Sequence, residues 1–215
     1  MGKAIQSLCN SRDDKIKIAN LKGHDISLKN VSAVIDFSSP STLDDLLKIC
    51  LENSLPLVCG TTGFSVMQLK NLEAAANKLP LMLASNMSLG IASLKKNLSR
   101  YLSTNTIPAA CKIVEIHHTK KKDSPSGTAL EISKFINEFA DLKINYPINI
   151  EAHRIGDHFG MHRVEFHSRE GAITSFNHYA ASRNIFAIGA LEAAAWLQSQ
   201  EFGLYSFSDF LNKKL

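Results

Sequence analysis

The sequence predicts an α/β fold in which a parallel sheet is interrupted by an inserted α+β domain, and two patterns carry this prediction. Over the first two-fifths of the 215 residues, short apolar segments alternate with helical segments, an order that gives parallel strands joined by helices. After Gly90 the pattern changes, and the segments between 147 and 182 alternate polar and apolar side chains, which is typical of antiparallel strands. We therefore expect one domain at 1–88 and 183–215 and a second at 89–182.

The first domain is expected to alternate strands and helices in chain order. The expected strands are 15–21, 32–38, 55–64 and 79–88. A helix at 39–54 follows from its Ser/Thr start, its early acidic residues and its apolar periodicity, and a second is expected at 66–78. The segment 186–211 should form a long alanine-rich helix with a short tail, which returns the chain to this domain.

The inserted domain is expected to combine helices with a sheet. Helices are predicted at 92–103 and 126–140, and a strand at 111–118. The segments "PINIEAHRI", "HRVEFHS" and "AITSFNHYAAS" follow as probable antiparallel strands. Because their side chains alternate in polarity, one face of this sheet should be wet or paired with a partner.

Composition excludes several functional classes. Hydrophobic residues make up 45% of the chain and charged residues 20%, with a net charge of +4, so a nucleic-acid partner is not indicated, whereas a small anionic substrate or cofactor suits the mild positive charge. The cysteines Cys9, Cys50, Cys59 and Cys111 lack CxxC spacing and sit in apolar surroundings, which indicates buried free thiols in a reducing cytoplasm. No stretch reaches eighteen apolar residues, so no membrane partner is expected.

Three polar segments follow predicted parallel strands. They are "DFSSPST" (36–42), "GTTGF" (60–64) and "ASNMS" (84–88). In open α/β sheets, ligands bind beyond the carboxyl ends of the strands. Gly60 would let the backbone approach a ligand, and Thr61 and Thr62 offer hydroxyls. Taken singly, each segment is equally explained as a turn or a helix cap; together they indicate a nucleotide or dinucleotide crevice.

The stretch "EIHHTKKKDSPSGTA" (115–129) concentrates polar chemistry at another strand end. His117 can donate a proton near neutral pH, and Lys121 can hold an anion or supply a proton. We expect Pro125 just inside the following helix, Ser124 or Ser126 as its cap, and the N–H groups of 126–128 as a carboxylate site. Lys120 and Lys122 are interpreted as solvated. A zinc site fits less well, because adjacent histidines on a strand face opposite sides and no third ligand is spaced to join them.

This stretch resembles the signature E-x-H-H-x-x-K-x-D-x-P-S-G-T-A of the 4-hydroxy-tetrahydrodipicolinate reductase family. "VIDFSSPST", "VCGTTGF", "ASNMSLG" and "ASRNIFAIGALEAAAWL" are similar to further blocks of that family, in the same order. The resemblance implies a Rossmann-like domain and a substrate and tetramerisation domain with an open mixed sheet. It also implies NADH- or NADPH-dependent reduction of a small dicarboxylate in the diaminopimelate and lysine pathway, by a homotetramer. The cysteines and the absence of a long apolar stretch indicate a cytoplasmic protein.

The resemblance also assigns roles to single residues. His117 matches the family's proton donor and Lys121 its catalytic lysine. His118, Gly127 and Thr128 match contacts to the substrate carboxylates. Cofactor contacts are matched by two short blocks, namely Gly60, Thr61 and Thr62 and then Ala84, Ser85, Asn86 and Met87. No metal is implied.

The sequence departs from the family pattern in three places. Met1-Gly2 resembles the end of the glycine-rich phosphate turn, so the first strand and most of that turn are expected to be missing, through a start codon assigned too late or a truncated gene. Lys22 is the only near candidate for reading the cofactor's 2′ position, and Met161 stands where the family usually has Glu. The alternative is therefore an inactive remnant that still assembles or binds the dicarboxylate. A semialdehyde dehydrogenase is disfavoured because no cysteine lies in a polar turn.

Overall fold

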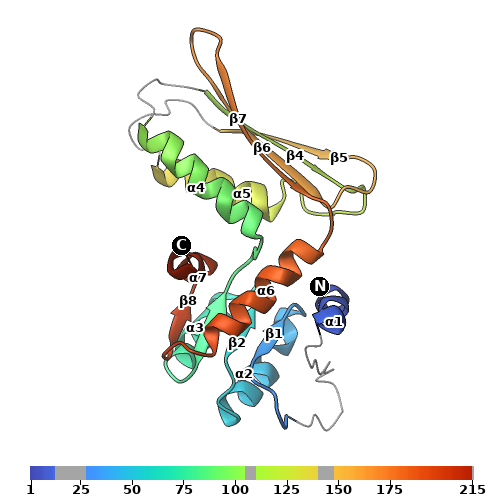
Figure 1. Cartoon of the computed structure of the whole chain (residues 1–215), viewed down its shortest axis with the longest axis vertical. Helices are drawn as coiled ribbons and strands as arrows, with labels where there is room; N and C mark the ends of the chain where they lie inside the picture. The colour runs from blue at the N-terminus through green and yellow to red at the C-terminus, as the bar shows by residue number, and fades with distance from the viewer. Residues whose placement is uncertain (13–27, 105–109, 140–147, 215) are drawn as a thin grey trace. The chain divides into compact units, whose positions relative to one another are not determined.

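The computed structural model describes residues 1–12, 28–104, 110–139 and 148–214, and the strand expected at 15–21 lies outside them. The chain divides into two compact units, one comprising Met1–Ser88 and Phe186–Leu215 and the other Leu89–Ile185. Each unit contains a four-stranded sheet with helices packed on it (Figure 1). Within the described ranges, no helix is both long enough and apolar enough to cross a membrane.

The sheet of the first unit is parallel throughout. Its strands, in spatial order, are β1 (Val34–Asp36), β2 (Leu57–Cys59), β3 (Pro80–Leu83) and β8 (Gly203–Tyr205). The first three confirm the strands predicted at 32–38, 55–64 and 79–88. The expected tail instead forms β8 and helix α7 (Phe207–Lys214). A three-residue strand that begins with glycine is too short for its polarity pattern to reveal it.

Helices cover both faces of this sheet. They are α1 (Gly2–Arg12), the short 3₁₀ helix η1 (Pro40–Thr42), α2 (Leu43–Glu52), α3 (Val66–Ala76) and α6 (Asn184–Leu197). Apolar side chains of α2 and α3 pack on β2 and β3, with Leu57, Leu72 and Leu81 fully buried. Helices α1 and α6 contribute Ile5 and Ala187 to a second cluster. Because successive side chains of a strand point to opposite faces of the sheet, the same strands can contribute to both clusters.

The sheet of the second unit is mixed. In chain order this unit contains α4 (Leu89–Thr104), β4 (Ala110–His117), α5 (Gly127–Phe139), β5 (Asn149–Arg154), β6 (Gly160–His167) and β7 (Ile173–Ala180). The spatial order is β5-β4-β6-β7, and β6 pairs antiparallel with both β4 and β7. β5 runs parallel to β4, so the antiparallel prediction for 147–155 was wrong. Helix α5 lies between these strands in the chain, and a crossover through a helix makes strands parallel.

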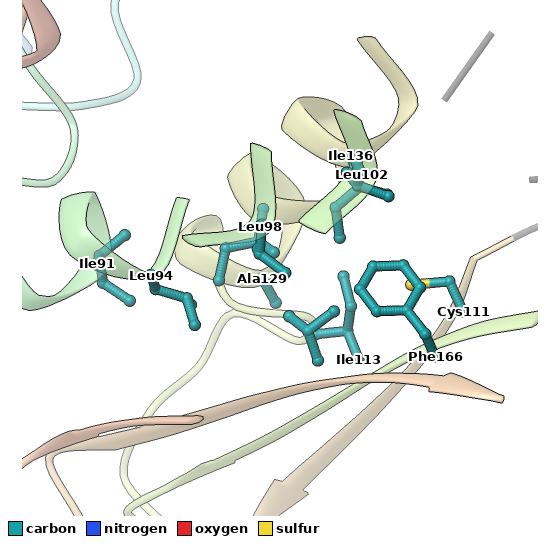
Figure 2. Close-up of a cluster of buried hydrophobic side chains, with 11 residues drawn as sticks. Ile91, Leu94, Leu98, Leu102, Cys111, Ile113, Ala129, Ile136 and Phe166 are labelled. Carbon is teal, nitrogen blue, oxygen red and sulfur yellow. The ribbon is translucent and has the colours of Figure 1, made fainter. Parts of the chain in front are cut away.

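One face of this mixed sheet forms the core of the second unit. Helices α4 and α5 pack on it, and Figure 2 shows Leu98, Ile113 and Phe166 among the side chains that fill the interface. All three are at most 2% exposed. Side chains of the opposite face are more exposed, including Ile173 and Tyr179 at about 60%. The packed face fixes the position of β4, whose end carries the candidate site.

Candidate active site

The packed face of the mixed sheet changes from apolar to ionisable along β4. Cys111, Ile113, Glu115 and His117 are all buried and alternate with half-buried residues, because side chains two apart on a strand point to the same side. On β6, His162 lies directly opposite Glu115. The pairing register therefore gathers a carboxylate and two imidazoles at the carboxyl end of β4.

Glu115 is fully buried and well supplied with hydrogen-bond donors. Its Oε1 accepts from the backbone N–H of Ser126 at 3.0 Å and from Nη2 of Arg154 at 2.9 Å, while its Oε2 lies against Nδ1 of His117. Burial alone would raise the pKa of Glu115, but the bonds from Arg154 and Ser126 outweigh it and lower the pKa. The carboxylate is therefore ionised at neutral pH, as a buried charge with such partners can be.

The imidazole of His117 is buried beside this carboxylate. Burial lowers the pKa of His117; Glu115 opposes that shift and the positive charge of Lys121 adds to it. Gly160 makes space for the ring, because a Cβ at this position would lie only 2.9 Å from Nε2 of His117. An imidazole with a lowered pKa releases its proton readily, which suits a proton donor.

His162 is the second imidazole of the group. Its ring centroid lies 5.1 Å from that of His117, and its Nε2 is 3.3 Å from the hydroxyl oxygen of Ser126. Burial, with the nearby His117, lowers the pKa of His162 to about 3, so the ring is neutral at physiological pH. We infer that it supports the site as a neutral polar group.

Lys121 lies in the loop that links β4 to α5. Its Nζ is 2.9 Å from Oδ1 of Asp123, and its side chain is 23% exposed. The side chains of Lys120 and Lys122 are exposed, whereas that of Lys121 is half-buried. This agrees with the interpretation of Lys120 and Lys122 as solvated residues. Burial alone would raise the pKa of Asp123, but Lys121 and the N–H of Gly127 lower it. The carboxylate of Asp123 therefore occupies the position beside Lys121, just before helix α5.

Helix α5 begins later than predicted. It starts at Gly127, and the hydroxyl of Ser126 accepts the N–H of Ala129 at 3.2 Å, so Ser126 is the N-cap. Pro125 precedes this cap, and the prediction that it lies inside the helix was wrong. The N–H of Ser126 is bonded to Glu115 and does not serve a ligand. Of the predicted anion-binding groups, Gly127 and Thr128 form the first helical turn.

His118 follows the end of β4 and is separated from the buried group. Its N–H donates to the carbonyl of His158 at 2.7 Å, and its side chain is half-buried. As the alternation along the strand requires, of these two adjacent histidines only His117 points to the packed face. A role for His118 must therefore differ from that of His117.

Three groups in this site have the chemistry of metal ligands. One ligand atom each from Glu115, His117 and His162 lie within 4.8 Å of one another, so the strand register supplies the third ligand that the sequence spacing did not. However, the guanidinium of Arg154 bonds the same carboxylate at 2.9 Å, and a divalent cation there would face that positive charge. The arrangement favours proton transfer over metal binding.

The three predicted strand ends of the first unit do lie together. β1, β2 and β3 are adjacent and parallel, so the segments that follow them emerge at one edge of the sheet. The N–H of Gly60 donates to the carbonyl of Asp36 at 2.8 Å, and that of Ala84 donates to the carbonyl of Cys59 at 3.0 Å. This edge is where α/β sheets bind nucleotides.

The reasons for Gly60 and Thr61 differ from those expected. A Cβ at Gly60 would lie 2.1 Å from Cε1 of Phe37, so the glycine makes room for an aromatic ring of the same unit. The hydroxyl of Thr61 donates to Oδ2 of Asp36 at 2.6 Å, and its oxygen accepts the N–H of Ser38 at 2.9 Å. This hydroxyl is therefore engaged within the unit, and the cofactor contact of Thr61 stays a prediction. Thr62 is exposed.

The third strand end is partly enclosed. Ala84 and Met87 are buried, Ser85 is exposed, and the side-chain oxygen of Asn86 accepts the N–H of Ser88 at 2.9 Å. Helix α6 approaches closely here, because a Cβ at Gly189 would lie 1.8 Å from the carbonyl oxygen of Met87. The loop conformation is thus fixed by packing and by its own hydrogen bonds.

Sequence reasoning missed Glu115, Arg154 and His162 as members of the site. The sequence could have indicated Glu115, because a residue two positions before His117 on a strand shares its face. Arg154 and His162 become neighbours only through the pairing of β5 and β6 with β4. No spacing within the sequence indicates that register.

Both units match models of a known family. Residues 1–87 match the model described as dihydrodipicolinate reductase, N-terminus, and residues 90–211 match the model for its C-terminus. A 4-hydroxy-tetrahydrodipicolinate reductase of Bdellovibrio bacteriovorus is 40% identical over 196 residues, covering 90% of this chain and 83% of that protein. Its counterpart from Campylobacter lari is 36% identical over 231 residues, with 98% and 94% covered.

A solved structure resembles the whole fold. It is a dipicolinate-bound dihydrodipicolinate reductase from Paenisporosarcina sp. TG-14, with a TM-score of 0.68 and 22% sequence identity. The match covers 91% of this chain and 82% of that one. This likeness supports the assignment of a Rossmann-like unit joined to a unit with a mixed sheet.

Proposed function

The chain belongs to the dihydrodipicolinate reductase family and reduces 4-hydroxy-tetrahydrodipicolinate to tetrahydrodipicolinate with NADH or NADPH, and we propose that His117 and Lys121 are its catalytic residues. This reaction is a step of diaminopimelate and lysine biosynthesis. Matches across both units favour the enzyme over an inactive remnant. The observation that carries the residue assignment is the buried imidazole of His117, held between Glu115 and Gly160 near the charge of Lys121.

We assign the two units different tasks. The unit at 1–88 and 183–215 binds the dinucleotide, and the unit at 89–182 binds substrate and mediates assembly. The nicotinamide, when bound, supplies the hydride, and the protein supplies orientation and proton chemistry. His117 delivers a proton to the reduced ring system, and Lys121 stabilises negative charge or contributes to that proton transfer.

A dicarboxylate needs two anion sites, and the second unit offers suitable groups. Lys121 and the N–H of Gly127 hold the Asp123 carboxylate in this structure. We propose that one substrate carboxylate takes this position, with Thr128 as a further donor from the first turn of α5. His118 contacts the substrate from outside the buried group.

The cofactor site is proposed at the shared edge of β1, β2 and β3. Gly60, Thr61 and Thr62 contact the cofactor after β2, and Thr61 does so through its backbone because its hydroxyl bonds Asp36. After β3 the contacts come from the second predicted block, Ala84, Ser85, Asn86 and Met87.

We further propose a cytoplasmic homotetramer. Exposed Ile173 and Tyr179 lie on the face of the mixed sheet that is not packed in the unit's core, and apolar side chains on such a face suit pairing with another copy. Multi-angle light scattering should give four times the chain mass of 23.6 kDa. A monomer would contradict the assembly.

The substitution His117→Gln tests the catalytic assignment. It should lower kcat by about a hundredfold or more, the scale expected for losing a general acid, with little change in folding. The rate is followed as NADPH oxidation with freshly formed substrate. His153→Gln is the matched control, because His153 is an exposed histidine of the same sheet. Near-normal kcat in His117→Gln would overturn the assignment.

A further inference from the structure

The buried side chain of Glu115 contacts His117, Arg154 and the backbone N–H of Ser126. These contacts connect it to the proposed catalytic groups. We propose that Glu115 is a positioning residue, which fixes the proton of His117 on Nδ1 and holds the start of helix α5 in place. This inference rests on the proposed role of His117. Glu115 itself contacts neither substrate nor cofactor in this scheme.

The first step concerns which nitrogen of His117 carries the proton. Oε2 of Glu115 lies against Nδ1, and an ionised carboxylate accepts hydrogen bonds without donating them. Nδ1 must therefore carry a proton, which leaves Nε2 as the nitrogen that exchanges a proton with the substrate. Gly160 offers no side chain beside Nε2, so this nitrogen is the less obstructed one.

The second step concerns the loop that carries Lys121. Arg154 donates to Oε1 of Glu115 at 2.9 Å and also to the backbone carbonyl of Asp123 at 2.5 Å. The same Oε1 accepts the N–H of Ser126, the cap of α5. One carboxylate oxygen thus connects β4, β5 and the loop that presents Lys121 and Gly127.

The third step concerns charge. The groups that influence His117 are Glu115 on its own strand, Arg154 on β5, His162 on β6 and Lys121 in the loop. Burial lowers the pKa of His117, and Lys121 and Arg154 act in the same direction; Glu115 alone among these charged residues raises it. Removing that negative charge should therefore reduce the protonated fraction of His117 at neutral pH.

Glu115→Gln separates charge from shape. Ser126 and Arg154 both donate to Oε1, so the amide oxygen takes that position and the NH₂ group faces Nδ1 of His117. Nδ1 must then accept a hydrogen bond, which moves the proton of the neutral ring to Nε2 and disfavours the imidazolium. We expect kcat to fall at least about tenfold, with the alkaline limb of its pH profile moved to lower pH and KM changed less than kcat.

A matched control and a double substitution distinguish positioning from general support of the fold. Glu131→Gln removes another ion-paired carboxylate of this unit, 2.8 Å from Lys95, and should leave the profile unchanged. In the His117→Gln background, Glu115→Gln should cause no further loss of kcat. An equal loss in both backgrounds, or an unmoved pH profile, would overturn the proposal.

Imidazole ¹⁵N NMR of the unsubstituted protein tests the same point without a substitution at Glu115. The His117 signals, assigned by their loss in His117→Gln, should show the Nδ1–H form when the ring is neutral. An Nε2–H form would refute the positioning role. This outcome is independent of the catalytic assignment, which fails separately if His117→Gln keeps its activity.

Discussion

Asp36 and Glu115 are both buried carboxylates at the carboxyl ends of strands, one in each unit, but their partners differ. Asp36 accepts hydrogen bonds from the Thr61 hydroxyl and the N–H of Ser38, which are neutral donors. Glu115 faces a guanidinium and an imidazole in addition to a backbone N–H. The first set of partners fixes two loops against each other, whereas the second also couples the carboxylate to a titrating group.

The comparison extends to three buried cysteines, of which Cys50 and Cys59 lie near Asp36 and Cys111 lies on β4 in the second unit. Cys50, Cys59 and Cys111 are buried and free. Burial raises the pKa of the Cys50 thiol to about 12, and the negative charge of Asp36 adds to the shift. A thiol with such a pKa remains protonated and is a poor nucleophile. The absence of a nucleophilic cysteine among these three agrees with the sequence argument against a semialdehyde dehydrogenase.

Among the substitutions that test this comparison, Lys121→Ala is expected to have the largest effect, which is on kcat. Because Lys121 carries the positive charge beside His117 and Asp123, its loss should lower kcat about a hundredfold or more. The unfolding midpoint in urea should stay nearly constant, since the residue lies in a loop. Steady-state kinetics and urea titration of the same preparation measure both quantities.

Lys120→Ala and Lys122→Ala are the internal controls for that substitution. Both side chains are exposed, and each variant should keep most of its activity. If either proved as damaging as Lys121→Ala, the assignment of the catalytic lysine within this loop would be wrong.

Asp36→Asn should have the opposite pattern of effects, because it should lower stability and leave kcat nearly unchanged. It keeps the shape of the side chain but weakens its bonds to Thr61 and Ser38, so the free energy of unfolding should fall by about 1–3 kcal/mol. At saturating cofactor, kcat should change little. Urea unfolding and initial rates test this pair of outcomes. A large loss of kcat with unchanged stability would remove the distinction between the two carboxylates.

Acid pH offers a smaller test, through His162. Its pKa of about 3 in the folded chain lies below the ordinary value of 6.5, so the unfolded chain takes up this proton first. Stability is therefore lost as pH falls from about 6.5 towards 3, by up to about 1.4 kcal/mol per pH unit. His162→Gln should flatten this part of the stability curve in urea titrations at several pH values. A curve as steep as that of the unsubstituted protein would contradict the burial of a neutral ring.

The two networks also show how far the sequence leads. The polar ends of β1, β2 and β3 follow from strand–helix alternation, and the position of His117 follows from its place at the end of a predicted strand. The partners of Glu115 depend instead on strand register, and Arg154 was placed on an antiparallel strand that proved parallel. At the start of α5, Ser126 was one of the two predicted caps, but Pro125 precedes this cap and does not lie inside the helix. Local patterns define faces and ends, but pairing between distant segments selects the neighbours.

The smallest effect is expected at Thr128, in the first turn of α5. Thr128→Val removes one hydroxyl donor to a substrate carboxylate, which is worth about 1 kcal/mol, so KM for the dicarboxylate should rise roughly fivefold while kcat and stability stay nearly constant. Thr61→Val provides the matched change in the other network, because its hydroxyl bonds Asp36 at 2.6 Å; it should lower stability and leave that KM unchanged. Substrate titrations and urea unfolding of both variants measure the contrast. Equal effects on KM would show that the two threonines do not serve separate networks.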